Sequence, residues 1–477
     1  MKKALFGISS LLCSLMAFSQ EPADALRYSW YVPGGSARTQ AVGGAMGSLG
    51  GDVTATFVNP AGLAFFKTGD FIFSPNYQLQ KTKATYYTRQ EQEKLNKFTV
   101  GTTGFVLGSG GSNSKNVRNV AFSLAFNRTA DFNSNMLYRG QNNQSSFSQK
   151  FSEELNNSGI RDSRVEYDFP LGASLAYNTY WVDAIKNASG EIESFVTSAP
   201  VATGLLQQYT YESNGGLNEF ALGMAVNLKD KLMIGGSIGV PVLWYNRETE
   251  FLESDATDNT ANRFDYGIFS DKLNTKGVGV NLKAGLIYKP AEYWRIGFAV
   301  HTPTFYSITD KYEASVVLND DVADEQAWTD ESKSYTGGQP SEFKYLLTTP
   351  YRVMGSISYV LREIEDVTKQ KGFITADIEY VNYKASSFSP DEDNNNDEST
   401  KQYLKTLNTA IDQAYKGAFN FRAGGELKFT TIMVRLGAAY YGNPYKDIQG
   451  EKGSKLNLSG GLGYRNKGFF VDLTYVH

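Results

Sequence analysis

The sequence has 477 residues and a formal net charge of −4 at pH 7, which is too small to indicate a nucleic-acid partner. It contains 30 Tyr, 30 Phe and 46 Gly against 13 Pro, and its mean hydropathy is −0.36. A soluble chain of this length usually divides into domains with helical stretches rich in Leu and Ala. Aromatic residues and glycines along nearly the whole length instead suit a transmembrane β-barrel, because polar positions facing the lumen lower its mean hydropathy.

The N-terminus has the features of a secretory signal. Lys2 and Lys3 precede a short apolar run over Ala4–Phe18, and a signal peptidase accepts the small residues around Ser19. The apolar run is too short to cross a bilayer as a helix. The sequence therefore predicts a cleaved signal peptide over residues 1–19.

The single cysteine, Cys13, lies inside this predicted signal peptide. Little apolar sequence precedes Cys13, so we expect no lipid anchor there. The mature chain would then hold no disulfide, no thiol nucleophile and no thiolate metal ligand. No later stretch approaches eighteen consecutive apolar residues, so no transmembrane helix is predicted.

Residues 34–66 differ from the rest of the chain in being rich in small side chains. Asn59 precedes Pro60, which favours a turn with Asn59 outside the helical region, and proline suits the first position of a helical turn. Small residues allow close backbone packing but cannot build a large core alone. We therefore predict a compact element enclosed by a barrel. The alternatives are a glycine-rich linker and a dinucleotide loop, and the latter lacks a strand–loop–helix unit around its glycines.

From about residue 70, segments of roughly ten residues alternate in polarity, and a polar connection follows each. This pattern predicts an all-β, antiparallel transmembrane barrel over residues 70–477. The clearest segments are Asn119–Asn127, Phe220–Leu228, Leu232–Tyr245, Val278–Tyr288, Trp294–Thr302, Val353–Leu361, Phe373–Tyr383, Phe419–Phe429, Met433–Tyr441, Leu456–Tyr464 and Phe469–Val476.

The same alternation fits a half-buried strand of a secreted β-sandwich. In Phe419–Phe429 the apolar residues share one face, and polar residues such as Asn420 and Arg422 take the other. The aromatic residues at both ends of this segment fall where a strand would cross the lipid headgroups. They favour the barrel over the sandwich.

The connections alternate between short and long. Residues 229–230, 290–293, 430–431 and 465–467 are short, 362–371 is intermediate on the same side, and the long polar ones are 246–276, 303–345, 384–417 and 442–454. Outer-membrane barrels have short periplasmic turns and long external loops. We therefore expect Phe220–Leu228 to run towards the periplasm and Leu232–Tyr245 to run outwards.

Strict alternation of direction has two consequences. Residues 132–217 must contain an even number of crossings, so the strand-like segment Phe169–Tyr177 is expected in an external or lumenal excursion. The last segment, Phe469–Val476, would end outside, whereas single-chain bacterial barrels have an even number of strands. We therefore expect about fourteen strands, with one C-terminal strand missing from this chain.

The histidines and the acidic stretch 391–398 do not form a recognisable catalytic or metal site. His301 and His477 are the only histidines, which gives no zinc site, and no serine partner for His301 is indicated. Residues 391–398 carry oxygen ligands at alternate positions, but Asn396 and Gln402 stand where a calcium loop has glycine and glutamate. We expect a solvated external loop there, and neither a metal, a cofactor nor an enzyme activity.

Two stretches near the N-terminus, Gly43–Ala45 and Asn59–Ala64, resemble the hatch of the outer-membrane transporters for long-chain fatty acids and aromatic hydrocarbons (the FadL/TodX type). Later stretches resemble the family's central hairpin, its Thr-Pro-aromatic-Arg strand start and its Asp-x-Glu-Tyr strand: Lys283–Pro290 with Trp294–Gly297 and His301–Pro303, Thr349–Arg352, and Asp377–Tyr383. The resemblance covers most of the chain and is weaker between residues 85 and 270.

The resemblance implies a monomeric barrel in the bacterial outer membrane, surrounded by its lipids and lipopolysaccharide, with residues 20–69 as a hatch inside the lumen. It implies passive uptake of a hydrophobic small molecule, such as a long-chain fatty acid or a hydrocarbon, with sideways release through the wall. The alternatives are a general porin, whose lumen would be open, and an adhesin-like barrel that displays its loops. The expected ligand-binding and gating residues are Asn59, Pro60, Ala61, Gly62, Leu63, Phe65 and Phe66.

Overall fold

The computed structural model describes residues 21–32, 34–110, 116–257, 259–320, 327–362, 370–394, 397–446 and 453–477. The predicted signal peptide, with Cys13, lies outside the described residues. So do parts of the predicted connections 362–371, 391–398 and 442–454.

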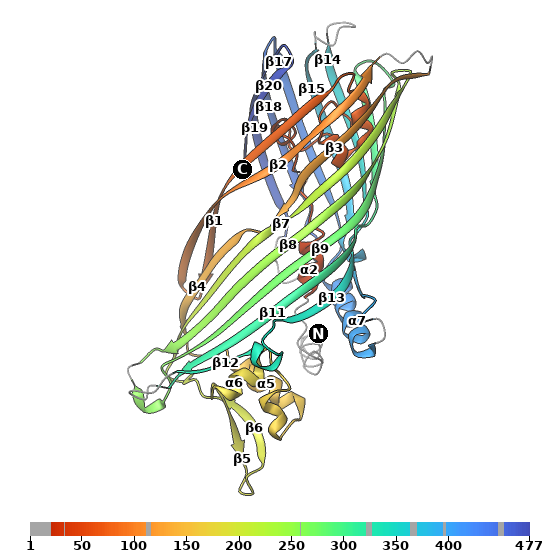
Figure 1. The fold of residues 1–477 in the computed structure, drawn as a ribbon. Helices are drawn as coiled ribbons and strands as arrows, with labels where there is room; N and C mark the ends of the chain where they lie inside the picture. The colour runs from red at the N-terminus through yellow and green to blue at the C-terminus, as the bar shows by residue number, and fades with distance from the viewer. Residues whose placement is uncertain are drawn as a thin grey trace.

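One sheet of eighteen strands dominates the described part of the chain (Figure 1). We call this sheet the wall. Its strands are β1 (Asp70–Tyr86), β2 (Arg89–Gly110), β3 (Val117–Asp131), β4 (Ser134–Asn142), β7 (Leu205–Leu228), β8 (Leu232–Asp255), β9 (Tyr266–Tyr288), β10 (Trp294–His301), β11 (Phe305–Asn319), β12 (Trp328–Glu331), β13 (Ser341–Thr348), β14 (Arg352–Arg362), β15 (Gln370–Asn382), β16 (Ser387–Pro390), β17 (Gly417–Phe429), β18 (Ile432–Tyr441), β19 (Lys455–Asn466) and β20 (Phe469–Val476).

The wall is antiparallel throughout, and several of its passages are interrupted. β9 pairs with both β10 and β11, and β7 pairs with both β3 and β4, so each of these pairs continues along one line. Within the described residues, β1 pairs with β2 and β20 pairs with β19, and no β1–β20 pairing closes the ring. The predicted additional strand stays a prediction.

The predicted alternating segments lie within these strands, except that Thr302 and Tyr383 fall one residue beyond β10 and β15. Two of the predicted long loops are wrong. Residues 246–276 and 303–345 consist largely of strand, because β8, β9, β11 and β13 continue far beyond the apolar segments. In this part the outward face is charged, as in the ion pair between Lys272 and Glu248 at 3.5 Å. A strand outside the bilayer needs no apolar face, so the membrane pattern ends before the strand does.

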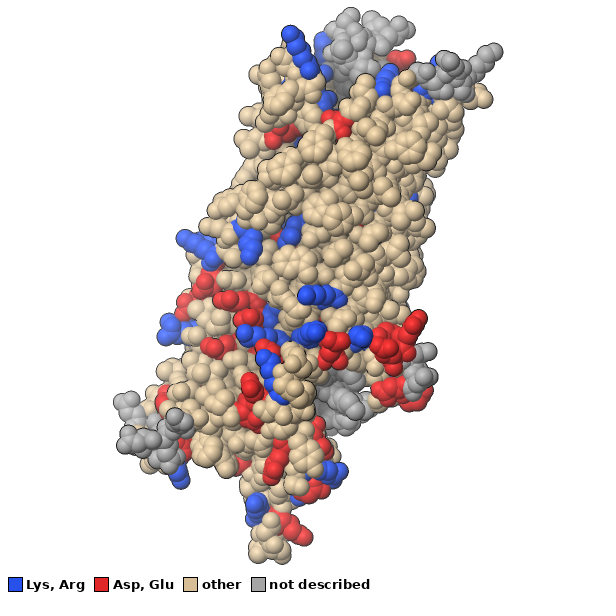
Figure 2. Space-filling view, in the orientation of Figure 1, with Lys and Arg blue, Asp and Glu red and all other residues tan. Residues whose placement is uncertain are grey.

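The wall exposes its large apolar side chains on the outside, which is the reverse of the arrangement in a soluble protein. On β7, Leu222 and Met224 are exposed on the outside, while Gly223 and Ala225 between them are buried against the interior. Figure 2 shows a broad band without charged side chains in the upper half of the molecule, with charges gathered below it and at the upper rim. A soluble monomer rarely exposes so large an apolar surface, which indicates contact with lipid.

Residues 143–204 form a separate unit, the cap, beyond the ends of β4 and β7 (Figure 1). The segment Phe169–Tyr177 lies in this excursion from the wall, as expected, but it is helical rather than strand-like, because it contains most of α6. Its apolar residues, Leu175 and Ala176 among them, are buried on all sides, and a short, fully buried apolar run does not distinguish helix from strand. The elements of the cap are α5 (Gln149–Ser158), η2 (Ser163–Glu166), α6 (Ala173–Asn178), β5 (Val182–Lys186) and β6 (Ile192–Thr197).

A buried carboxylate ties the cap to the wall. Glu253 of β8 is fully buried and accepts hydrogen bonds from the amide of Phe147 at 2.9 Å, the indole of Trp181 at 3.1 Å and the amide of Gln207 at 3.0 Å, as well as from the hydroxyl of Ser146. Burial raises the pKa of Glu253, and the hydrogen bonds oppose that rise.

Replacing Glu253 with alanine is expected to release the cap from the wall. The change removes the acceptor that four donors share; Gln207 and Ser146 keep a second partner, whereas the amide of Phe147 and the indole of Trp181 lose their acceptor. This loss costs about 2–4 kcal/mol of local stability. Limited proteolysis should then cleave residues 143–204 faster while the detergent-extracted wall keeps its strand content by circular dichroism. Glu250 to alanine on the same strand serves as the control. Equal protease resistance in the two variants would contradict this role of Glu253.

No helix in the described ranges combines the length and the apolar character that a membrane crossing requires. The remaining helical elements are the N-terminal α2 (Pro22–Arg27), α3 (Ala37–Ala41), α4 (Ala55–Val58) and η1 (Pro60–Phe65), with η3 (Thr260–Asn262), η4 (Ser332–Tyr335), η6 (Tyr383–Ala385) and α7 (Glu398–Ala414) in the connections.

Candidate functional site

The N-terminal segment, residues 21–69, lies inside the wall and crosses the interior (Figure 1). Its α3 contacts β18, β19 and β20, and η1 contacts β3, β7, β8 and β9. Between them, the amide of Gly47 donates to Asp377 of β15 at 3.1 Å, and the guanidinium of Arg295 of β10 donates to the carbonyl of Leu49. The segment therefore meets the wall on many sides of the interior.

Asn59 organises the centre of this segment. Its backbone is extended, with φ −144° and ψ 100°, and its side chain accepts a hydrogen bond from the amide of Ala61 at 3.1 Å, which starts η1 at Pro60. The same side chain donates to the carbonyl of Gly47 at 2.6 Å and to that of Leu286 in the wall at 3.3 Å. The predicted turn and the helical turn after it are both present, and one fully buried asparagine joins them to the wall.

Glycines on the inner face of the wall let the segment approach the strands closely. A Cβ on Gly235 of β8 would lie 2.6 Å from the amide of Ala61, and one on Gly285 of β9 would collide with the side chain of Asn59. On the opposite side, a Cβ on Gly437 of β18 would collide with the amide of Gly43. Small residues on both partners therefore make a close contact that larger side chains would prevent.

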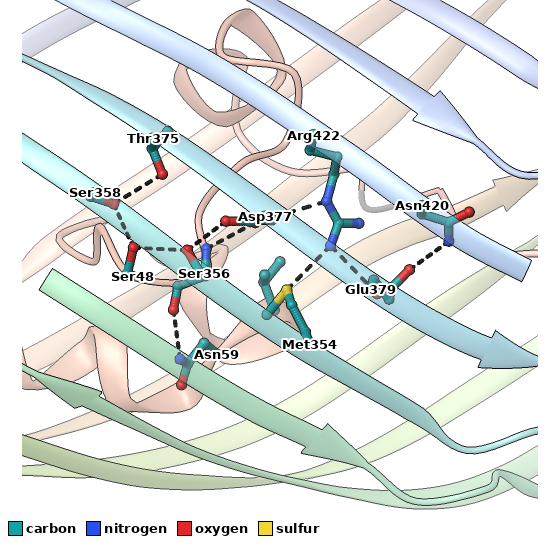
Figure 3. Close-up of polar contacts among 12 residues, drawn as sticks. Ser48, Asn59, Met354, Ser356, Ser358, Thr375, Asp377, Glu379, Asn420 and Arg422 are labelled. Carbon is teal, nitrogen blue, oxygen red and sulfur yellow. Dashed lines mark hydrogen bonds and ion pairs between the residues drawn. The ribbon is translucent and has the colours of Figure 1, made fainter.

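A polar cluster on β14, β15 and β17 holds the middle of the segment (Figure 3). The hydroxyl of Ser48 bonds to those of Ser356, at 2.7 Å, and Ser358 on β14. Ser356 in turn donates to Asp377 at 2.6 Å, the same carboxylate that accepts from Gly47. We call these residues, together with Arg422, Glu379 and Asn420, the clasp.

Arg422 is the only cation of the clasp. Its side chain is 1% exposed and reaches from β17 towards Asp377, with N···O 3.8 Å, and Glu379, at 3.5 Å (Figure 3). Asn420 donates to Glu379 at 2.8 Å. Two carboxyl groups and one guanidinium thus lie together in the interior, and Gly47 and Asn420 donate further hydrogen bonds to the carboxyl oxygens.

The structure brings the seven predicted site residues together in η1 and its flanks. Leu63 and Ala61 are fully buried in an apolar cluster with Ile72, Val106 and other wall residues. Pro60 and Gly62 are buried with them, Phe65 lies under the guanidinium of Arg295 at 4.4 Å, and Phe66 is 8% exposed. None of the seven lines the inner cavity that lies beside Tyr28 and His301.

A small inner cavity of about 40 Å³ lies beside the Tyr28–Tyr31 stretch of the N-terminal segment. His301 lines it, and its imidazole Nε2 lies 2.9 Å from the carbonyl oxygen of Val58. The aromatic and charged lining was missed, because its residues come from separate strands and from the N-terminal segment. The main lining residues are Tyr28, Trp30, Tyr31, Leu217, Glu219, Lys283, His301, Tyr306 and Arg352.

Two helices close the interior above this cavity. α2 packs in one apolar cluster with β8, β9 and β11, and α7 lies against α2 and β16. Asp397 begins α7, and hydrogen bonds from Thr400 and Ser399 hold the pKa of this carboxyl at about 2. An acid of the predicted 391–398 loop therefore serves as a helix cap.

No family model matches the sequence, and no curated protein matches it. The fold, in contrast, matches solved structures. A FadL homologue from Pseudomonas aeruginosa has a TM-score of 0.51 at 12% identity, covering 94% of this chain and 90% of that one. The ΔS2S3 mutant of TodX, a monoaromatic hydrocarbon channel, has a TM-score of 0.52 at 12% identity, covering 93% and 92%. At this identity the likeness shows a shared fold.

The chain therefore has the fold of FadL/TodX-type channels, as its sequence motifs predict. Another match is the CymD monoaromatic hydrocarbon channel, at 12% identity and a TM-score of 0.46.

Proposed function

We propose that this protein is an integral outer-membrane channel for the passive uptake of hydrophobic small molecules, with residues 20–69 as its hatch. One observation carries the proposal: the N-terminal segment crosses an interior whose wall presents apolar side chains to the outside. An open porin would leave that interior free. An apolar ligand such as a long-chain fatty acid or an aromatic hydrocarbon fits a plugged wall, because it needs a binding pocket rather than a water column.

The favourable free energy of ligand binding comes from burial of the ligand's apolar surface. Each methylene transferred from water to an apolar site contributes about 0.8 kcal/mol, so a pocket between aromatic side chains captures a ligand that the hydrated lipopolysaccharide layer excludes. Release then requires a change in the pocket. A hatch packed through glycines can shift with little side-chain rearrangement, and the ligand leaves sideways through the wall into the membrane.

Under this proposal, the structure corresponds to a closed state of the channel. The inner cavity of about 40 Å³ has room for water. A benzene-sized ligand needs a cavity on the order of 150 Å³. Entry therefore requires that α7, α2 or the Tyr28–Tyr31 stretch move aside. These segments are held by side-chain contacts rather than by the wall ladders.

Substituting Gly62 by leucine tests the hatch. A Cβ at Gly62 would lie 2.9 Å from that of Ala55 and 3.0 Å from the Cα of Gly50, so leucine must displace the floor while leaving every wall strand unchanged. We expect cells carrying this variant to take up radiolabelled long-chain fatty acid about tenfold more slowly, with normal amounts of protein in the outer membrane. Gly355 to leucine serves as the control, because a Cβ at Gly355 on β14 would meet only the side chain of Ile378, at 3.6 Å. Unchanged uptake in the Gly62 variant would refute the hatch.

Two measurements separate the alternatives. A steady open conductance of the unmodified protein in planar bilayers would identify a porin. Binding to surfaces that survives deletion of residues 34–66 would identify an adhesin. Mass spectrometry of lipids that co-purify with the detergent-extracted protein would show the ligand class, and light scattering of the same sample would test the predicted monomer.

A further inference from the structure

The hairpin of β1 and β2 extends beyond its neighbours in the wall as a two-stranded arm (Figure 1). β2 pairs with β3 only over Thr103–Gly110, whereas its pairing with β1 continues to Arg89. We call residues 75–100 the arm. Its tip lies at the same end of the wall as the cap, since the hydroxyl of Tyr87 donates to the side chain of Asn142 of β4 at 3.0 Å. This end carries the long connections, which are external in outer-membrane barrels.

Alternate residues of the arm face outwards, and their character changes along the arm. From the membrane towards the tip, the outward pairs are Tyr77–Phe98, Leu79–Asn96, Lys81–Lys94 and Lys83–Gln92. The exposed rings of the first pair continue the apolar band of the wall, and the lysines begin two pairs further on. Successive outward residues on one strand lie about 7 Å apart. The order therefore matches that of the acyl chains and the headgroup of a lipid lying along the arm.

The lysines of the arm have no acidic partners. Lys81 and Lys94 lie directly opposite each other, and like charges in this arrangement destabilise an antiparallel pair. Lys83 is the next outward residue on β1, and all three side chains are exposed. The arm is described over its whole length, and its acids, Glu91 and Glu93, lie on the other face. None of the three lysines forms an ion pair with a residue that the structure describes.

Outward lysines on the external part of β9, β11 and β13 differ in this respect, because each has a carboxylate beside it. The nitrogen–oxygen distances are 3.5 Å for Lys272–Glu248, 3.1 Å for Lys311–Glu342 and 3.1 Å for Lys344–Asp393. Figure 2 shows Lys and Arg side chains at the left edge of the molecule, where β1 lies in Figure 1, at the lower border of the band without charges. The complement of the arm is therefore an anion from outside the chain, at the level where lipid headgroups lie.

We propose that Lys81, Lys83 and Lys94 bind the phosphate groups of a phosphorylated glycolipid of the outer leaflet, the lipid A part of lipopolysaccharide, whose acyl chains lie along Tyr77 and Phe98. A phosphate group accepts charge-assisted hydrogen bonds from several ammonium groups at once, so it relieves the repulsion between the opposed lysines. The bound lipid thereby fastens to the leaflet an arm that has few strand neighbours of its own. The site lies on the outside of the wall, so it is independent of the ligand that the proposed channel carries.

Titration of the detergent-extracted full chain with bisphosphorylated lipid A tests this site. The arm variant combines Lys81→Gln, Lys83→Gln and Lys94→Gln. The matched control combines Lys272→Gln, Lys311→Gln and Lys344→Gln, which removes the same charge from lysines that have acidic partners. We expect the dissociation constant to rise about a hundredfold in the arm variant and to stay unchanged in the control. Lipid A without its phosphates should bind equally to the unmodified protein and to the arm variant.

The single variant Lys94→Glu separates lipid binding from the stability of the arm. A glutamate at this position would lie opposite Lys81 and turn a repulsive pair into an attractive one. The arm should then resist limited proteolysis at least as well as in the unmodified protein, while the affinity for lipid A falls. A purely structural role of the lysines predicts the opposite result, a changed protease resistance with an unchanged affinity.

Equal affinity of the arm variant and the unmodified protein for lipid A would overturn the proposal, and so would an equal loss in the control. Full competition by inorganic phosphate at the concentration of the lipid would also overturn it, because the site would then be one for free phosphate. Unchanged affinity together with dimer formation by the arm variant in light scattering would show that the lysines instead protect the open edge of β1 from pairing with a second copy.

Discussion

Replacing Asn59 with alanine should turn the closed interior into a leaking pore. The change removes the acceptor for the amide of Ala61 and the donor to the carbonyl of Gly47, both in the interior. Loss of these buried hydrogen bonds costs about 2–4 kcal/mol, enough to raise the population of a displaced hatch by about one and a half to three orders of magnitude. Single-channel recordings should then show frequent openings that the unmodified protein lacks, and cells should become sensitive to large antibiotics.

The control for this prediction is Asn246 to alanine. Asn246 lies on β8 and bonds to Asn214 and Asn274 of the neighbouring strands rather than to the N-terminal segment. We expect its conductance to match that of the unmodified protein. If the Asn59 variant also stays closed, the hatch is held by its apolar and glycine contacts, and Asn59 is not a determinant of closure.

Replacing Arg422 with methionine should prevent stable assembly of the wall. The change strands Asp377 and Glu379 as buried carboxylates on β15 with no cation between them. Breaking a buried ion pair on one side costs about 3–5 kcal/mol, because the remaining charge cannot be solvated. We expect loss of the heat-modifiable, folded band on electrophoresis and little protein in the outer membrane.

A compensating variant distinguishes charge from packing. Combining Arg422→Met with Asp377→Asn and Glu379→Gln removes all three charges and keeps an acceptor for Gly47. This triple variant should regain most of the folded protein, since a neutral network of similar volume is often as stable as a buried ion pair. Failure of the triple variant to recover, while the single variant fails, would show that the shape of Arg422 matters more than its charge.

We therefore expect closure and assembly to depend on different parts of the interior. Asn59 fixes the local fold of the hatch and bonds to β9, whereas the clasp joins β14, β15 and β17 to each other and to Gly47 and Ser48. A ligand that displaces η1 can therefore disturb the first set of contacts and leave the second in place. The strands that carry the clasp, β14, β15 and β17, then stay in place while η1 moves.

The sequence by itself determined the features that local physics controls. Alternation in segments such as Phe419–Phe429 follows from two different environments on the two faces of one strand, and the strand lies at those residues. The turn at Asn59–Pro60 follows from restrictions on the residues themselves, and it too is present. The wall from residue 70 onwards could be predicted on this basis.

The sequence pattern failed to predict the secondary structure in two cases. In one the segment is buried on all of its faces, and in the other the strand continues beyond the bilayer. α6 is enclosed on every face, so its residues carry no period that distinguishes helix from strand. The outer parts of β8 and β9 have polar side chains outside, so they look like loops in the sequence. Both errors arise from the same cause: periodicity reports the contrast between two environments rather than the backbone conformation.

Only the tertiary structure determined which side chains meet in the interior. Arg422 reaches two carboxylates of a neighbouring strand, and Lys283 reaches Glu219 across β8, because the register of the strands sets which inward side chains meet. The inner cavity likewise joins residues that are far apart in the chain. Register and closure are properties of the whole wall, and no local window of sequence contains them.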